Sequence, residues 1–164
     1  MPILTQELIQ ELHTRYTNVV DYIGIQNNGQ PNGLRIKQVQ LPSSLTQSLA
    51  YHYIVENPNS IGVQNIITEN FCEGNNRTYD LIYRTDNMVI NIEVKATGTN
   101  DFQRFRPKAL SANFVLWLNF RGNQYDIAIF NPNILAPGDT GEADIKWDKL
   151  VQLQNVDLVN NRII

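Results

Sequence analysis

The sequence predicts a mixed α/β fold in a single domain, and three observations support this prediction. The chain has 164 residues, which is enough for one domain with a core but short for two. Its apolar fraction of 42% and charged fraction of 18% are typical of a globular protein. Periodic segments follow one another as two helices, three strands, a short helix and two strands, an order typical of mixed α/β domains.

The first predicted helix runs from about Thr5 to Ile23. Its apolar residues recur every three or four positions and form one stripe: Leu4, Leu8, Leu12, Tyr16, Val19, Val20 and Ile23. Residues Gly24 to Gly33 are rich in Asn, Gln and Gly and predict a loop. Leu34 to Leu41 alternates and predicts a short strand or hairpin arm with two exposed cations, Arg35 and Lys37.

The second helix begins near Ser44, whose spacing to Gln47 fits a capping box. It should end before Asn57, because the residue before proline avoids helical geometry. Later segments predict a strand over Ile61–Thr68, a helix starting at Pro107, and a closing hairpin. The two strands of that hairpin are Phe114–Phe120 and Tyr125–Phe130.

The most informative segment is the apolar run from Met88 to Ala96, which contains Glu93 and Lys95. In a strand, successive side chains point to opposite faces, so the apolar residues share one face and this charged pair shares the other. Asp80 lies upstream in a second short strand-like run, with Asp86-Asn87 as a turn between the two. Charged residues rarely enter a buried strand without a partner or a task.

These residue types suit a divalent-metal site. Mg²⁺ prefers hard oxygen ligands, which the carboxylates of Asp80 and Glu93 and the carbonyl of Val94 would supply. Lys95 could orient or deprotonate a water and stabilise developing negative charge. The alternative is that Glu93 and Lys95 form an ion pair on an exposed sheet edge, with Asp80 as a turn residue.

At these positions the sequence resembles the PD-(D/E)XK nuclease superfamily, which includes many type II restriction endonucleases. The resemblance consists of Asp80, a hairpin-sized gap, and then Glu93-Val94-Lys95. It implies that Asp80 and Glu93 bind metal and that Lys95 is the catalytic lysine. It also implies a restriction-endonuclease-like core, with a mixed central sheet whose antiparallel meander is flanked by helices. We therefore divide the chain into an N-terminal helix and arm (1–41), a catalytic core (42–130) and a C-terminal extension (131–164).

Other residues are weaker candidates. By resemblance Glu56, at the end of the second helix, is a possible accessory acid, with Glu69 and Glu73 as competitors. A polar and basic group follows the proposed site and could contact DNA: Gln103, Arg104, Arg106 and Lys108. Alternatively this group belongs to a solvated loop anchored by two phenylalanines. Arg35 and Lys37 form a second candidate group for DNA.

Composition limits the possible functions. The net charge of −3 and pI of about 5.3 are mildly unfavourable to a DNA-binding protein, although local fields decide binding. The single Cys72 cannot form an internal disulfide, and the first residues lack the apolar core of a secretory signal. No apolar run approaches a membrane span. We therefore expect a cytoplasmic location.

Together these patterns predict an Mg²⁺-dependent endonuclease that cleaves double-stranded DNA, as a sequence-specific type II restriction enzyme. A homodimer would place one active site on each strand of a palindromic site. The alternatives are a junction-resolving or DNA-repair nuclease, and a DNA-binding or protein-interaction module without catalysis.

Overall fold

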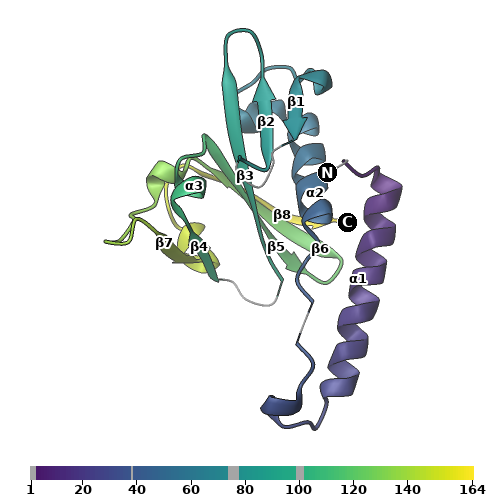
Figure 1. Ribbon diagram of the computed structural model, residues 1–164. Coiled ribbons are helices and arrows are strands. Elements are labelled where there is room, and N and C mark those ends of the chain that lie inside the picture. Colours follow the sequence, from purple (N-terminus) through teal and green to yellow (C-terminus); the bar gives the residue numbers. More distant parts are fainter. Residues whose placement is uncertain (1–2, 38, 74–77, 99–101) are drawn as a thin grey trace.

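The computed structural model describes residues 3–37, 39–73, 78–98 and 102–164. Its centre is a mixed, mostly antiparallel six-stranded sheet flanked by helices (Figure 1), as the sequence predicts. In spatial order the strands are β1 (Phe71–Glu73), β2 (Leu81–Arg84), β3 (Val89–Thr97), β5 (Phe114–Arg121), β6 (Gln124–Phe130) and β8 (Val156–Ile163). A second, two-stranded sheet consists of β4 (Phe102–Phe105) and β7 (Ala143–Lys146).

Strands β1, β2 and β3 form an antiparallel meander, and β5 and β6 form the predicted hairpin. Strand β5 lies parallel to β3, with Ile92 opposite Phe114 and Thr97 opposite Asn119. Parallel neighbours require a crossover connection, which here contains β4 and the short helix α3 (Pro107–Leu110). This crossover brings α3 and its basic residues over the face of β3 that carries Glu93.

Two helices cover the other face of the sheet: α1 (Gln6–Asn27) and α2 (Ser43–Glu56). The far end of α1 extends beyond the sheet (Figure 1). His13 Nε2 donates a hydrogen bond of 2.9 Å to the carbonyl of Gly122, at the tip of the β5–β6 hairpin. No described helix is both long and apolar enough to cross a membrane.

The predicted apolar stripe of α1 is partly wrong. Leu8 and Val19 are exposed, whereas Ile9, His13 and Ile23 are buried. The buried line is narrow and rotated from the predicted one, because Ile9 packs in the larger core and His13 contacts the tip of the β5–β6 hairpin. The spacing of apolar residues alone could not reveal which side of α1 would pack against the rest of the protein.

Two predicted strands are also wrong. Residues Leu34–Leu41 form no strand among the described positions, and Ile61–Thr68 is irregular between short 3₁₀ turns. At the first site, the Asn27 amide satisfies both main-chain groups of Ile36, at 2.9 and 2.7 Å. With those groups paired, the chain needs no neighbouring strand there.

The described 3₁₀ turns are η1 (Asn32–Leu34), η2 (Pro58–Ile61), η3 (Thr68–Asn70) and η4 (Pro132–Ile134).

The alternation of β3 divides the protein into two cores. Ile90, Ile92 and Val94 pack with α1 and α2 in the larger core. Trp117 and Phe105 belong to the smaller core on the opposite face, beneath the β4–β7 sheet, α3 and α4 (Trp147–Leu150). The charged face of β3 is therefore covered by a second layer, and only part of the Lys95 side chain stays exposed.

A buried polar trio joins β3 to β5 close to Lys95. Trp117 Nε1 donates to Thr97 Oγ1 at 3.0 Å, and this hydroxyl donates to Asn119 Oδ1 at 3.1 Å. All three side chains are buried. Because the Thr97 hydroxyl bonds both the Trp117 N–H and the Asn119 carbonyl, it stabilises the pairing of the strand that carries the charged residues.

We predict that Thr97→Val destabilises the protein by about 2 kcal/mol or more, because it leaves the Trp117 N–H and the Asn119 carbonyl unsatisfied in the core. Urea denaturation measures the change. Thr97→Ser keeps the hydroxyl and should cost much less, so equal losses for the two variants would contradict this role.

Candidate active site

Glu93 is a buried carboxylate in a central strand. The residue is 2% exposed, because α3 and β4 cover its face of β3. Its Oε1 lies 2.7 Å from Lys95 Nζ, and the Lys95 side chain retains 26% exposure. The alternative of a solvated ion pair on a sheet edge is therefore wrong: the pair is adjacent on one face, as predicted, but that face is enclosed.

Asp80 lies immediately before β2, where β3 continues beyond the end of its neighbour. Its Oδ2 accepts a hydrogen bond from the Val94 N–H at 2.8 Å, and its Oδ1 accepts one from Gln47 Nε2 at 3.2 Å. In an extended strand the N–H and C=O of one residue point to the same neighbour. The Val94 carbonyl therefore faces the side of β3 on which Asp80 lies.

Burial raises the pKa of the Asp80 carboxyl above its usual range. The Val94 hydrogen bond opposes this rise, whereas the negative charge of Glu93 adds to the rise in pKa. Lys95 and Lys108 lower the pKa through their positive charges. The two carboxylates therefore repel each other in a partly desolvated site, a situation that a shared cation would relieve.

A second lysine, Lys108 from α3, reaches the same carboxylate. Its Nζ lies 3.1 Å from Glu93 Oε2 and donates a 3.0 Å hydrogen bond to the Thr78 carbonyl. Oε2 itself is buried and has no hydrogen-bond partner among the described residues. The ammonium thus balances the charge of this oxygen without being aligned to hydrogen-bond it.

The donor set fits a hard divalent cation. Asp80 and Glu93 offer carboxylate oxygens and Val94 offers a carbonyl. Glu93 Oε2 has no hydrogen bond among the described residues, although the Lys108 ammonium lies 3.1 Å away. No group of three His, Cys, Asp or Glu side chains able to hold a metal occurs in the part of the chain that is described. Such a site suits Mg²⁺, which usually keeps several waters and takes only one or two carboxylates.

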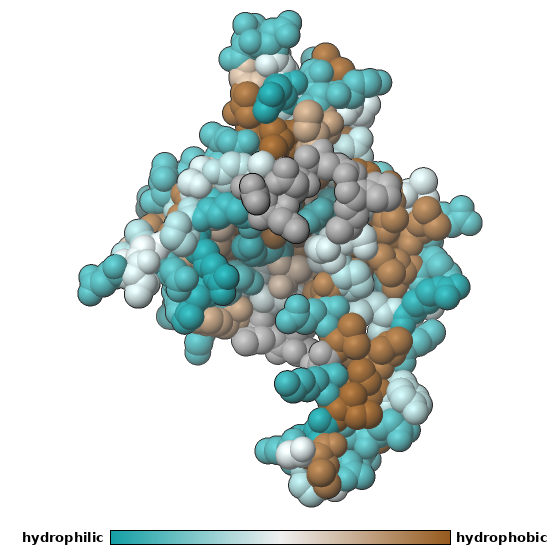
Figure 2. Space-filling view, in the orientation of Figure 1, coloured by the Kyte–Doolittle hydropathy of each residue, from teal (hydrophilic) through white to brown (hydrophobic). Residues whose placement is uncertain are grey.

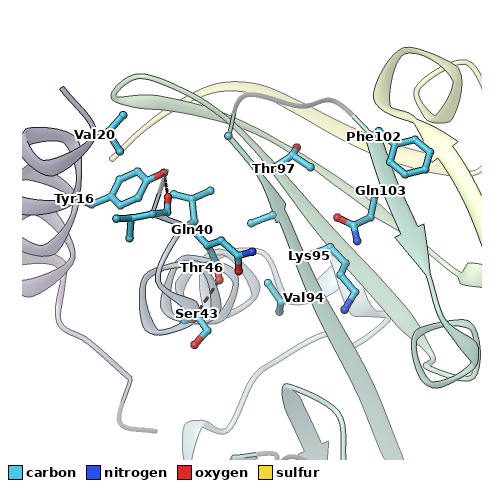
Figure 3. Close-up of a pocket in the computed structure, with 14 residues that line it drawn as sticks. Tyr16, Val20, Gln40, Ser43, Thr46, Val94, Lys95, Thr97, Phe102 and Gln103 are labelled. Atoms are coloured by element: carbon cyan, nitrogen blue, oxygen red, sulfur yellow. Dashed lines mark hydrogen bonds between the residues drawn. The ribbon is translucent and has the colours of Figure 1, made fainter. Parts of the chain in front are cut away.

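Two hollows meet beside this pair of charged residues. One, of about 490 Å³, is lined by Glu93, Lys95, Gln103, Arg104, Arg106, Lys108 and Ala109. The other, of about 610 Å³, lies between α1, the segment before α2, β3 and β4. In Figure 3, Lys95 from β3 and Gln103 from β4 lie at the side of this larger hollow, and both residues also line the smaller one.

The polar and basic group predicted to contact DNA divides between different environments. Gln103 and Arg104 lie on β4, which is a strand and not a solvated loop. Arg104 forms a two-bond pair with Asp144 at 2.8 and 2.9 Å. Arg106 is highly exposed and lies 4.0 Å from Glu142, whereas Lys108 joins the buried carboxylate.

The other predicted positions that the structure describes lie away from this site. Glu56 pairs with Arg162 at 2.9 Å and lies nine residues beyond Gln47 on α2, roughly 13 Å along the helix. Glu56 is therefore engaged with Arg162 at the other end of α2, and its role as accessory acid stays a prediction. Arg35 and Lys37 are exposed on the arm, and Arg35 donates to the Gln30 carbonyl. Glu69 lines a separate hollow near Cys72, and the Glu73 side chain lies outside the described part.

Sequence reasoning missed Gln47 as the α2 residue that reaches Asp80. It assigned Gln47 to a capping box, but α2 is preceded by Pro42 and has no side-chain cap. The available signal was a polar residue on an otherwise largely buried helix, where Leu45, Thr46, Ser48 and Leu49 are all buried. A polar residue in that setting needs a partner.

The raised pKa of Asp80 predicts a pH-dependent stability. A carboxyl whose pKa is higher in the folded state takes up protons on folding, so ionised Asp80 destabilises the fold above its unfolded value of about 3.9. In EDTA, Asp80→Asn should raise the melting temperature at neutral pH, and this gain should shrink as the pH falls toward about 4.

Thermal denaturation across this range measures the effect, with the exposed turn residue Asp86 providing Asp86→Asn as the control. A wild type that melts at or above the temperature of Asp80→Asn at neutral pH would contradict the prediction.

Comparisons with known proteins add no family to this description. No protein-family model matches the chain, and no curated protein shows significant similarity to it. Function is therefore inferred from the residues of the site and their surroundings.

Proposed function

We propose that this chain is an Mg²⁺-dependent endonuclease that cleaves double-stranded DNA, acting as a sequence-specific type II restriction enzyme. One observation supports this most strongly: a buried carboxylate and a lysine on β3 and a second carboxylate just before β2 lie close to a pocket rich in cations. The element order α2, β1–β2–β3, α3 and β5–β6 also agrees with the helix, meander, helix and strand order that the resemblance implies.

The proposed roles are those that the resemblance implies. Asp80, Glu93 and the Val94 carbonyl would hold the cation, which supplies charge stabilisation to the phosphate and lowers the pKa of a bound water. Lys95, fixed two residues from Glu93 on the same strand, would orient the attacking water. As the water oxygen bonds to phosphorus and the bond to the leaving oxygen breaks, this ammonium would stabilise the developing negative charge.

The neighbouring pocket supports a phosphodiester substrate. Four of its lining residues are cationic, namely Lys95, Arg104, Arg106 and Lys108. Lysine and arginine are the usual phosphate contacts in protein–DNA complexes. The amide of Gln103 lies between this pocket and the larger hollow, a position from which it could contact a base edge.

A homodimer belongs to the same proposal, because a chain with one such site needs a second copy to cut both strands together. Exposed apolar side chains concentrate at the far end of α1 and in the arm, including Ile25 at 71% and Leu34 at 72% exposure. Figure 2 shows this apolar surface at the lower end of the molecule. A patch of this kind is typical of protein–protein contacts.

The first test is incubation of the purified protein with plasmid DNA in Mg²⁺ or EDTA. The wild type should give discrete fragments only with Mg²⁺, and Lys95→Ala should reduce cleavage about 100-fold or more. The exposed Lys149 of α4 provides the matched control, Lys149→Ala, which should cut normally.

Preference for branched DNA would instead indicate a junction-resolving or repair nuclease. Absence of cleavage on every DNA, or equal cleavage by Lys95→Ala and wild type, would refute the catalytic assignment and favour a binding module.

The second test concerns the dimer. Sedimentation velocity should show a dimer for the wild type and a monomer for Ile25→Glu combined with Leu34→Glu. Ile163, at the other end of the chain and 73% exposed, provides the control Ile163→Glu, which should remain dimeric. A monomeric wild type, or a double variant that stays dimeric, would rule out this interface.

A further inference from the structure

Glu93 is balanced by two lysines that differ in their freedom to move. Lys95 is held on the same strand, 2.7 Å from Oε1. Lys108 comes from the four-residue helix α3, lies 3.1 Å from Oε2, and has a side chain that is 41% exposed. A lysine side chain is long and flexible, so Lys108 can leave the carboxylate toward solvent while Lys95 stays.

The oxygen beside Lys108 is the one that lacks a hydrogen bond. Glu93 Oε2 is buried and unpartnered among the described residues, while the ammonium donates to Thr78. A buried carboxylate oxygen without a hydrogen bond is costly, and a charge 3.1 Å away offsets only part of this cost. A ligand that binds Oε2 directly would therefore relieve this cost.

We propose that Lys108 is an internal counter-ion that occupies the place of the divalent cation at Glu93 and is displaced when the cation binds. This inference rests on the proposed function and assigns Lys108 a positioning role in it. Once displaced, the ammonium lies in the same pocket as Arg106, where it can bind the DNA phosphate. Metal and DNA then favour each other's binding, because the cation releases the lysine that the phosphate needs.

The two arginines of the pocket cannot act as the displaceable counter-ion of Glu93. Arg104 is paired with Asp144 and lies 3.6 Å from Glu142. Arg106 is 80% exposed and lies 4.0 Å from Glu142, and no contact with Glu93 is seen for it. Arg106 is therefore a matched control, a cation of the same pocket that does not touch the metal ligand.

The test is calorimetric titration of Mn²⁺ into the full chain without DNA. Lys108→Met should bind Mn²⁺ about tenfold more tightly than the wild type, because it lacks the competing charge. Arg106→Met should change the affinity for Mn²⁺ by about twofold or less, because the exposed Arg106 charge does not touch Glu93 and solvent ions screen its repulsion of the cation. Lys108→Gln repeats the test should the methionine variant not fold, as judged by thermal denaturation in EDTA.

A second measurement tests whether the displaced Lys108 binds a DNA phosphate. A labelled duplex of mixed sequence is titrated with and without Ca²⁺, which also takes oxygen ligands. Ca²⁺ should raise the affinity of the wild type for the duplex more than that of Lys108→Met.

Mn²⁺ binding by Lys108→Met that is no tighter than that of the wild type would overturn the inference. An equal gain in affinity for Arg106→Met would also overturn it, because the gain would then come from the overall positive charge of the pocket and not from Lys108 at Glu93. If the wild type nevertheless cuts plasmid DNA, the nuclease proposal stands without the lysine exchange. A tenfold gain in a protein that cuts no DNA would leave the exchange standing and refute the nuclease.

Discussion

The organisation of this protein depends on the burial of one carboxylate, that of Glu93, between two layers. A charge that is 2% exposed must be compensated by nearby groups, since an unpaired buried charge would strongly destabilise the fold. Lys95 supplies this compensation from the same strand and Lys108 from the crossover helix. The connection between β3 and β5 is therefore also the element that delivers the second cation. Fold topology and site electrostatics are linked at this point.

The two faces of β3 carry different tasks. Ile92 and Val94 anchor the strand in the larger core, so its backbone cannot shift without loss of apolar burial. Glu93 and Lys95 project from this fixed backbone into the smaller layer, where Thr97 and Trp117 tie β3 to β5. Side chains on a strand held from both sides keep their positions better than side chains on loops. This rigidity suits a site in which a water must be oriented within a few tenths of an ångström of its target.

Sequence reasoning succeeded where the physical cause is local. The alternation around Glu93 and Lys95, the hairpin turn before it, and the two long helices all depend on neighbours within a few residues. It failed where the cause is distant in sequence. The strand β4 exists because it pairs with β7, and Arg104 is occupied by Asp144, 40 residues away. Likewise, the choice between Gln47 and Glu56 on α2 depends on which helical turn faces the end of β2, which no local pattern states.

The acidic composition of the chain is compatible with a phosphate-binding site of this kind. At the pocket, Lys95 and Lys108 lie beside Glu93, and Arg104 lies beside Glu142 and Asp144. The local charge is close to balanced, and both lysines are engaged with Glu93. In the proposed function, a phosphate would find little free positive charge until a divalent cation took over the carboxylates, which would add two charges and free a lysine. Under the same proposal, the carboxylates that lower the pI would make affinity for phosphate depend on the metal, so that tight binding of DNA would coincide with readiness to cut it.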